Sequence, residues 1–248
     1  MEPRSLALAA LLLAPLGARA SGIDDLNRGL PLEIDDARPA KAGSFQPQAM
    51  FRYERTREGK DAYEVEPQLQ YGFSPRGHVQ FSADAKLGGA DKSGSGDTSL
   101  GALYRLHGTD ETTQVGLFAE LEFPSGIESA GVDEELGLIV TQPCGSENGI
   151  HLNATLLHNT APREGERQNG YRAAIGAHHE ISDGLLVLAD LVRFEEKNED
   201  DRANLVEAGA VTTVGKDFSA AFGFGVGVGE PSPHTRATVS FQYSLGGG

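Results

Sequence analysis

Charged side chains stand at alternating positions between apolar residues, and they are the first candidates for chemistry. Carboxylates outnumber cationic groups in this set, so a shared interior would favour cations and neutral polar solutes and repel anions. The same residues could instead form internal ion pairs that fill a narrow space, and both interpretations stay open. The candidate residues are Glu64, Glu66, Asp84, Lys86, Arg105, Glu120, Glu122, Arg172, Asp190, Glu207 and Arg236.

Histidines offer a second chemistry, because imidazole can act as a general base in a hydrolase. His151, His158, His178 and His179 are available, and of the adjacent pair only His178 falls on the row of the charged residues. The sequence has no G-x-S-x-G motif that would place a nucleophilic serine. We therefore expect these histidines to be solvated or hydrogen-bonded, and we expect no catalytic residue.

Metal binding finds little support. The acidic run from Glu195 to Asp201 offers oxygen ligands for Ca²⁺, but it lacks EF-hand spacing and the required glycine. Cys144 is the single cysteine, so no paired-cysteine metal site is possible. We expect a solvated loop at this run, no metal site and no cofactor.

The elements that position these residues follow from a two-residue period. In Ala62–Phe73 the apolar side chains occupy odd positions, and two carboxylates and two amides lie between them. Such alternation predicts a strand with one apolar and one polar face. The pattern recurs from Phe45 to Leu245 in about twelve segments of roughly ten residues, the length that a tilted strand needs to cross a bilayer.

The connections between these segments alternate in length. Every second connection is tight, as in SPRG and EISDG, whereas the others are longer and more charged, as in NTAPREGERQNG. Barrels of the outer membrane join their strands by short periplasmic turns and longer outer loops. The sequence therefore predicts an all-β fold: a transmembrane antiparallel up-and-down β-barrel of about twelve strands, with both termini at the periplasmic side.

Glycines support this interpretation. They gather on the row that carries the charges, for example at Gly116, Gly176, Gly209 and Gly223. A missing side chain on the inward row lets a strand bend and leaves interior volume free.

The chain of 248 residues divides into four predicted parts. Residues 1–20 have the charged start, short apolar run and Ala-Arg-Ala ending of a secretory signal peptide. Residues 21–44 are polar, acidic and interrupted by Pro31 and Pro39, which predicts an extended periplasmic lead without a packed core. Residues 45–245 would form the barrel domain, and 246–248 a glycine tail. The formal charge of -15 argues against nucleic-acid binding.

Several short motifs carry a family resemblance. They are Glu64–Gly72 (EVEPQLQYG), Gly94–Gly101 (GSGDTSLG) with Tyr104 and Arg105, Glu120–Gly126 (ELEFPSG), and Asp35–Arg38 before Gly43–Phe45. These motifs resemble the outer-membrane transporters of the phenol meta-cleavage-pathway type. The resemblance covers most of the chain after the predicted signal peptide and implies a Gram-negative outer-membrane barrel that passes small or hydrophobic molecules.

We therefore expect an outer-membrane channel or transporter for passive passage of small molecules, hydrophobic or aromatic ones included, and not an enzyme. Its expected partners are outer-membrane lipid or lipopolysaccharide, the barrel-assembly machinery and an unidentified small solute. Two alternatives stay open. A soluble periplasmic ligand-binding barrel or sandwich would turn the apolar row inward, and an outer-membrane lipid-modifying enzyme would use His158 or His178.

Overall fold

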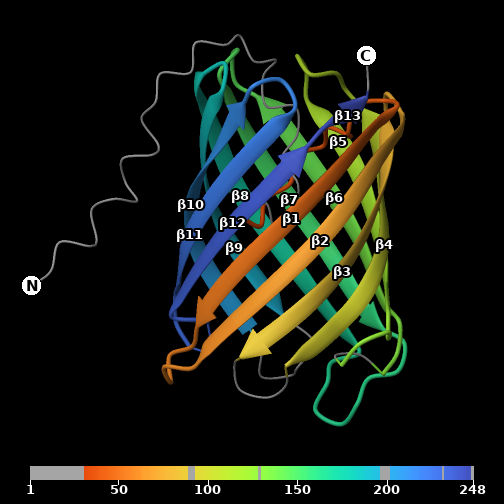
Figure 1. Cartoon of the computed structure of the whole chain (residues 1–248), viewed down its shortest axis with the longest axis vertical. Coiled ribbons are helices and arrows are strands. Elements are labelled where there is room, and N and C mark those ends of the chain that lie inside the picture. The colour runs from red at the N-terminus through yellow and green to blue at the C-terminus, as the bar shows by residue number, and fades with distance from the viewer. Residues whose placement is uncertain (1–30, 89–92, 128–129, 196–201, 231, 247–248) are drawn as a thin grey trace, which may run out of the picture.

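A computed structural model describes residues 31–88, 93–127, 130–195, 202–230 and 232–246. In this part of the chain, twelve long antiparallel strands follow one another around a ring, and β12 pairs with β1 to close it (Figure 1). The predicted fold class, an antiparallel up-and-down barrel, is confirmed. The strands are β1 (Ser44–Arg55), β2 (Asp61–Ser74), β3 (Gly77–Gly88), β4 (Gly94–His107), β5 (Gln114–Phe123), β6 (Asp133–Pro143), β7 (Asn148–Asn159), β8 (Asn169–Ser182), β9 (Leu185–Glu195), β10 (Arg202–Val214), β11 (Phe218–Gly227), β12 (Thr235–Tyr243) and the short β13 (Leu245–Gly246).

The apolar row of each strand points outward. Tyr63, Leu69 and Phe222 are 49%, 44% and 52% exposed, whereas Arg236 is 4% exposed. A soluble binding protein would show the opposite arrangement, because its apolar side chains would form the core. An apolar band around a closed barrel is the surface that acyl chains solvate. Among the described residues, no helix is long and apolar enough to span a bilayer.

The two ends of the barrel differ as the connection lengths predict. Residues 75–76 join β2 to β3 and residues 183–184 join β8 to β9 at one end, where the C-terminus also lies (Figure 1). The longer connections, from β5 to β6 and from β7 to β8, are at the other end. We call these the short-turn end and the long-loop end. In an outer-membrane barrel the short-turn end faces the periplasm.

Pro67 lies inside β2, where its missing N–H group would break a regular ladder. On one side it pairs with Ala49 of β1. On the other side, the pairing of β2 with β3 runs from Val65–Ala85 directly to Gln68–Ser82, which leaves Pro67 between paired positions. The proline therefore sits at an irregularity that tolerates the missing donor.

The outward orientation gives a stability prediction. Replacing Phe222, midway along β11, with arginine is expected to lower the free energy of unfolding in lipid vesicles by about 2–4 kcal/mol, because the charge would enter hydrocarbon. The matched change Val226→Arg lies near the strand end, and we expect it to cost about 0–1 kcal/mol. Denaturant titration of the protein folded into vesicles measures both values. Equal costs at the two positions would contradict the membrane-spanning orientation.

Candidate functional site

Residues 31–43 are here called the lumen segment. They run along the inside of the barrel as far as Ala40, and the last residues, of which Lys41 and Gly43 are exposed, lead into β1. Leu32, Ile34, Ala37 and Ala40 of this segment are each at most 2% exposed. The segment follows the inner wall from β11 to β2, and its red trace is visible between the strands in Figure 1. The expectation of a lead without a packed core is wrong for these residues. The rest of that lead, residues 21–30, and the expected signal peptide, residues 1–20, lie outside the described residues.

Wall side chains satisfy the backbone of the lumen segment, which forms no strand of its own. The side-chain amide of Asn153 accepts a hydrogen bond from the N–H of Asp35 (2.8 Å) and donates one to its carbonyl (3.0 Å). Near the other end of the segment, Nδ1 of His78 accepts a hydrogen bond from the N–H of Ala40 (3.0 Å). Polar side chains of the inward row therefore form the hydrogen bonds to the segment's backbone that a neighbouring strand forms elsewhere.

Asp190 holds the backbone of the lumen segment at Glu33 and Ile34. Its Oδ2 atom accepts hydrogen bonds from the N–H groups of Glu33 and Ile34, both at 3.1 Å, and the residue is 3% exposed. Two successive N–H groups that converge on one carboxylate oxygen set the local course of the chain. The side chain of Glu33 is thereby placed among the charges of the wall.

Three arginines from three strands surround the Glu33 carboxylate. Its Oε1 atom lies 2.7 Å from Nη1 of Arg236 and 3.4 Å from Nη2 of Arg52, and its Oε2 atom lies 3.9 Å from Nε of Arg172. Each arginine also contacts a carboxylate of the wall, so the cluster contains five carboxylates and three guanidiniums. These wall contacts are Arg52 with Glu64 (3.3 Å), Arg172 with Glu135 (3.7 Å), and Arg236 with Glu54 (2.5 Å) and Glu207 (3.9 Å).

A hydrogen-bonded relay lies farther along the lumen segment. Oγ1 of Thr141 accepts a hydrogen bond from the N–H of Ala37 (3.0 Å) and lies 3.2 Å from Nδ1 of His151. Nε2 of His151 lies 2.7 Å from Nδ1 of His178, and both rings are buried. The order that satisfies every atom has the Thr141 hydroxyl donating to His151, which in turn donates to His178.

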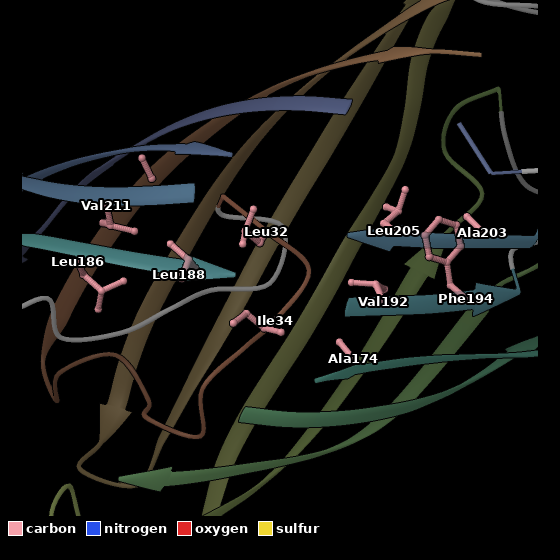
Figure 2. Close-up of a cluster of buried hydrophobic side chains, with 11 residues drawn as sticks. Leu32, Ile34, Ala174, Leu186, Leu188, Val192, Phe194, Ala203, Leu205 and Val211 are labelled. Atoms are coloured by element: carbon pink, nitrogen blue, oxygen red, sulfur yellow. The ribbon is translucent and has the colours of Figure 1, made fainter. Parts of the chain in front are cut away.

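The inner wall also carries an apolar patch, built by Leu186, Leu188, Val192 and Phe194 of β9 with Ala174, Ala203, Leu205, Val211 and Ala221 of neighbouring strands. Leu32 and Ile34 belong to the same buried cluster, and Figure 2 shows them on the chain that crosses the interior. The strand period predicts a polar inward face, and this prediction is wrong for this part of the wall.

Glycines of the inward row make room for the lumen segment. A Cβ atom at Gly223 would collide with the carbonyl of Pro31, and one at Gly72 would collide with the carbonyl of Lys41. A Cβ atom at Gly176 would lie 2.6 Å from Cδ1 of Ile34. The interior volume that these glycines leave is thus occupied by the protein's own chain.

The structure brings Glu64, Arg172, Asp190, Glu207 and Arg236 together around the lumen segment. The other candidates lie elsewhere along the inward row. Glu66 accepts a hydrogen bond from Gln68 (2.9 Å), and Glu120 accepts one from Gln80 (2.9 Å). Asp84 lies 3.9 Å from Lys86, and Arg105 forms an ion pair with Asp110 in a short turn (2.7 Å). Glu122 is the cross-strand partner of Ser99 and of Asp133.

Sequence reasoning missed Glu33, Arg52, Glu54 and Glu135 as members of the charge cluster. The three wall residues fall on the inward row, so the strand period contained the signal for them. Glu33 lies outside any strand, and no periodic signal could have found it. The unbroken apolar run from Leu185 to Ala189 is a signal that could have revealed the apolar inward face of β9, because strands covered on both faces are apolar throughout.

The remaining candidates show ordinary contacts. Nδ1 of His158 lies 2.9 Å from Oδ1 of Asn169, and the cross-strand partners of His158 are Glu134 and Asn169, so the described register places no serine beside it. His179 pairs with Asn148 (3.0 Å). Within the described ranges, no group of three or more His, Cys, Asp or Glu residues is placed to hold a metal ion. Of the acidic run that starts at Glu195, residues 196–201 lie outside those ranges.

Comparison with known proteins shows the fold. No family model and no curated protein matches the chain. The COG4313 outer membrane channel from Pseudomonas putida F1 is similar in structure, with a TM-score of 0.69 and 14% identity, over 85% of this chain and 98% of that chain. The KdgM porin in complex with disordered oligogalacturonate has a TM-score of 0.61 and 13% identity, over 80% of this chain and 99% of that chain.

The translocator domain of the autotransporter NalP from Neisseria meningitidis is also similar. Its TM-score is 0.57 at 11% identity, over 83% of this chain and 90% of that chain. Because a channel, a porin and a translocator share this architecture, the barrel by itself does not decide between their functions. The contents of the interior carry the functional argument.

The glycine contacts predict which changes release the lumen segment. In Gly223→Ala and Gly72→Ala, the three atoms nearest to the new methyl group all belong to the segment. We therefore expect faster cleavage by the glutamyl endopeptidase Glu-C after the buried Glu33 than in the wild type. Limited proteolysis of the folded protein, followed by mass spectrometry, measures the cleavage rates.

Gly137→Ala is the matched control, because its Cβ atom would meet Thr155 and Phe118 but no atom of the lumen segment among its nearest neighbours. We expect this variant to retain wild-type protection. Equal cleavage of all three variants and the wild type would show that the segment is not packed where the structure places it.

Proposed function

We propose that this protein is an outer-membrane channel for the passive passage of small molecules, and that the lumen segment narrows its interior. One observation carries the proposal: the barrel encloses residues 31–40 of its own chain between its walls. Wall side chains alone therefore do not fill the interior. A cross-section that admits a peptide segment can also admit a small solute.

Other observations support this proposal. The outer face is a continuous apolar band that suits a membrane, and the inner wall offers both charged and apolar surfaces. The COG4313 channel and the KdgM porin, which share the fold, are named as a channel and a porin. The motifs of the phenol meta-cleavage-pathway transporters support hydrophobic or aromatic solutes as cargo. We propose that the protein has no catalytic role and lies in the outer membrane, its short-turn end toward the periplasm.

The pairing of the interior charges bears on selectivity. Glu64, Arg172, Glu207 and Arg236 all have opposite charges within 4 Å, so their fields largely cancel at short range. We propose that these inward residues shape the passage chiefly through local ion pairs. A general preference of the lumen for cations stays a prediction.

Planar-bilayer recording tests the channel. We expect the purified full chain to give discrete conductance steps in KCl, and we expect larger steps when residues 31–40 are replaced by a Gly/Ser stretch of equal length. The reason is that the replacement removes the side chains that bind the wall. Heat-modifiable gel migration confirms that both proteins are folded. If both insert as folded barrels and neither conducts, the channel proposal is wrong.

A further inference from the structure

The Glu33 carboxylate occupies a site that the barrel wall has already built. Its three arginine partners come from β1, β8 and β12, and each guanidinium also contacts a wall carboxylate through a different nitrogen atom. Each arginine therefore has a carboxylate partner in the wall besides Glu33. Nε of Arg52 and Nη1 of Arg172 are buried and make no hydrogen bond to the described residues, so donor capacity is left over.

Exchange of Glu33 for a free carboxylate conserves the charge of the site. Without Glu33, four wall carboxylates face three guanidiniums, and an incoming carboxylate restores the balance that the folded protein already accommodates. Arginine suits this role because its planar donors bind both oxygens of a carboxylate. The overall acidity of the chain does not prevent a carboxylate from binding here, because the three guanidiniums converge on one point.

The surroundings of Glu33 define the rest of the ligand. Leu32 and Ile34, the residues on either side, pack into the apolar patch of β8 to β11 (Figure 2). The ring of Phe194 in this patch lies 5.7 Å from the guanidinium carbon of Arg236, so the apolar surface and the charged site are continuous. A ligand that fits both the apolar surface and the arginine site needs an apolar body and a single carboxylate.

We propose that the lumen binds small apolar carboxylates, and that Leu32, Glu33 and Ile34 occupy their place in the unliganded protein. The inference rests on the proposed channel function and specifies a substrate class for it. The site lies nearer the long-loop end, since Arg52 is close to the end of β1 and Arg236 is the second residue of β12. A solute that enters from the long loops meets this site before it reaches the short turns.

Glu33 belongs to the same chain as the three arginines, so it competes with a free carboxylate for them. A carboxylate held on the same chain competes at an effective concentration on the order of millimolar, so it weakens the binding of a free carboxylate without abolishing it. Removal of the Glu33 carboxylate should therefore strengthen binding of the free ligand. A purely structural ion cluster would not show this gain.

Isothermal titration calorimetry on the full chain in detergent tests the site with benzoate, benzamide and acetate. We expect Glu33→Ala and Glu33→Gln to bind benzoate about tenfold more tightly than the wild type, because the competitor is gone. Benzamide lacks the charge and acetate lacks the apolar body, so both should bind far more weakly. Two substitutions at Glu33 are used so that a folding failure of one leaves the test intact.

Arginine variants locate the site. Adding Arg172→Gln to Glu33→Ala should abolish the gain in benzoate affinity. Adding Arg105→Gln should preserve it, because Arg105 also faces inward but binds Asp110 at the short-turn end. Equal benzoate affinity in the wild type and both Glu33 variants, or equal affinity for benzamide and benzoate, would overturn the proposal.

The same preparations separate the two proposals. If the protein conducts KCl in planar bilayers but the Glu33 variants gain no benzoate affinity, the channel proposal holds and the carboxylate-site proposal is wrong. If the Glu33 variants gain benzoate affinity but the protein gives no conductance in bilayers, the carboxylate-site proposal holds and the channel proposal is wrong.

Discussion

Every backbone N–H and C=O group that meets hydrocarbon must find a partner within the protein, and this constraint determines the architecture. An open sheet would leave two bare edges in lipid, so the first and last long strands pair from Gln48–Gln242 to Arg55–Thr235. Closure then divides each strand into two unlike faces. One face meets acyl chains and is apolar throughout, and the other encloses a space whose polar groups must be satisfied by one another.

The polar side chains that face the enclosed space need hydrogen-bond partners, and the lumen segment supplies some of them. Asn153 and Asp190 point into the barrel, and the backbone of residues 33–35 supplies hydrogen-bond partners for their side chains. The Glu33 carboxylate in turn balances arginines from distant strands. Buried ion pairs add little net stability, since desolvation offsets their attraction, but they penalise any arrangement that leaves a charge unpaired. They therefore specify the position of the segment more than they stabilise the barrel.

The strands, their orientation and the two kinds of connection could be predicted from the sequence, because the two-residue period reports directly on which face meets lipid. The lumen segment could not. Its contacts, such as Asp35 with Asn153, join residues 118 positions apart and leave no periodic trace. Its prolines and acidic residues are also typical of solvated leads. The inward glycines were the one available sign, since Gly72 and Gly223 leave space that no wall side chain needs.

The barrel and the lumen segment are held by different kinds of interaction, and this separates their stabilities. Each long strand shares a ladder of backbone hydrogen bonds with two neighbours, and the loss of one strand would open the ring. The lumen segment has no such ladder. It is bound by hydrogen bonds with side chains such as Asn153 and His78, each worth about 1 kcal/mol net, by the burial of Leu32 and Ile34 in the apolar patch, and by ion pairs whose charges the wall can partly compensate without it. Local opening free energies follow the density of such contacts, so we expect the segment to leave the wall at a lower free-energy cost than that of unfolding the barrel. A closed barrel with a separately held interior segment can thus keep its membrane-spanning wall intact while the contents of its lumen change.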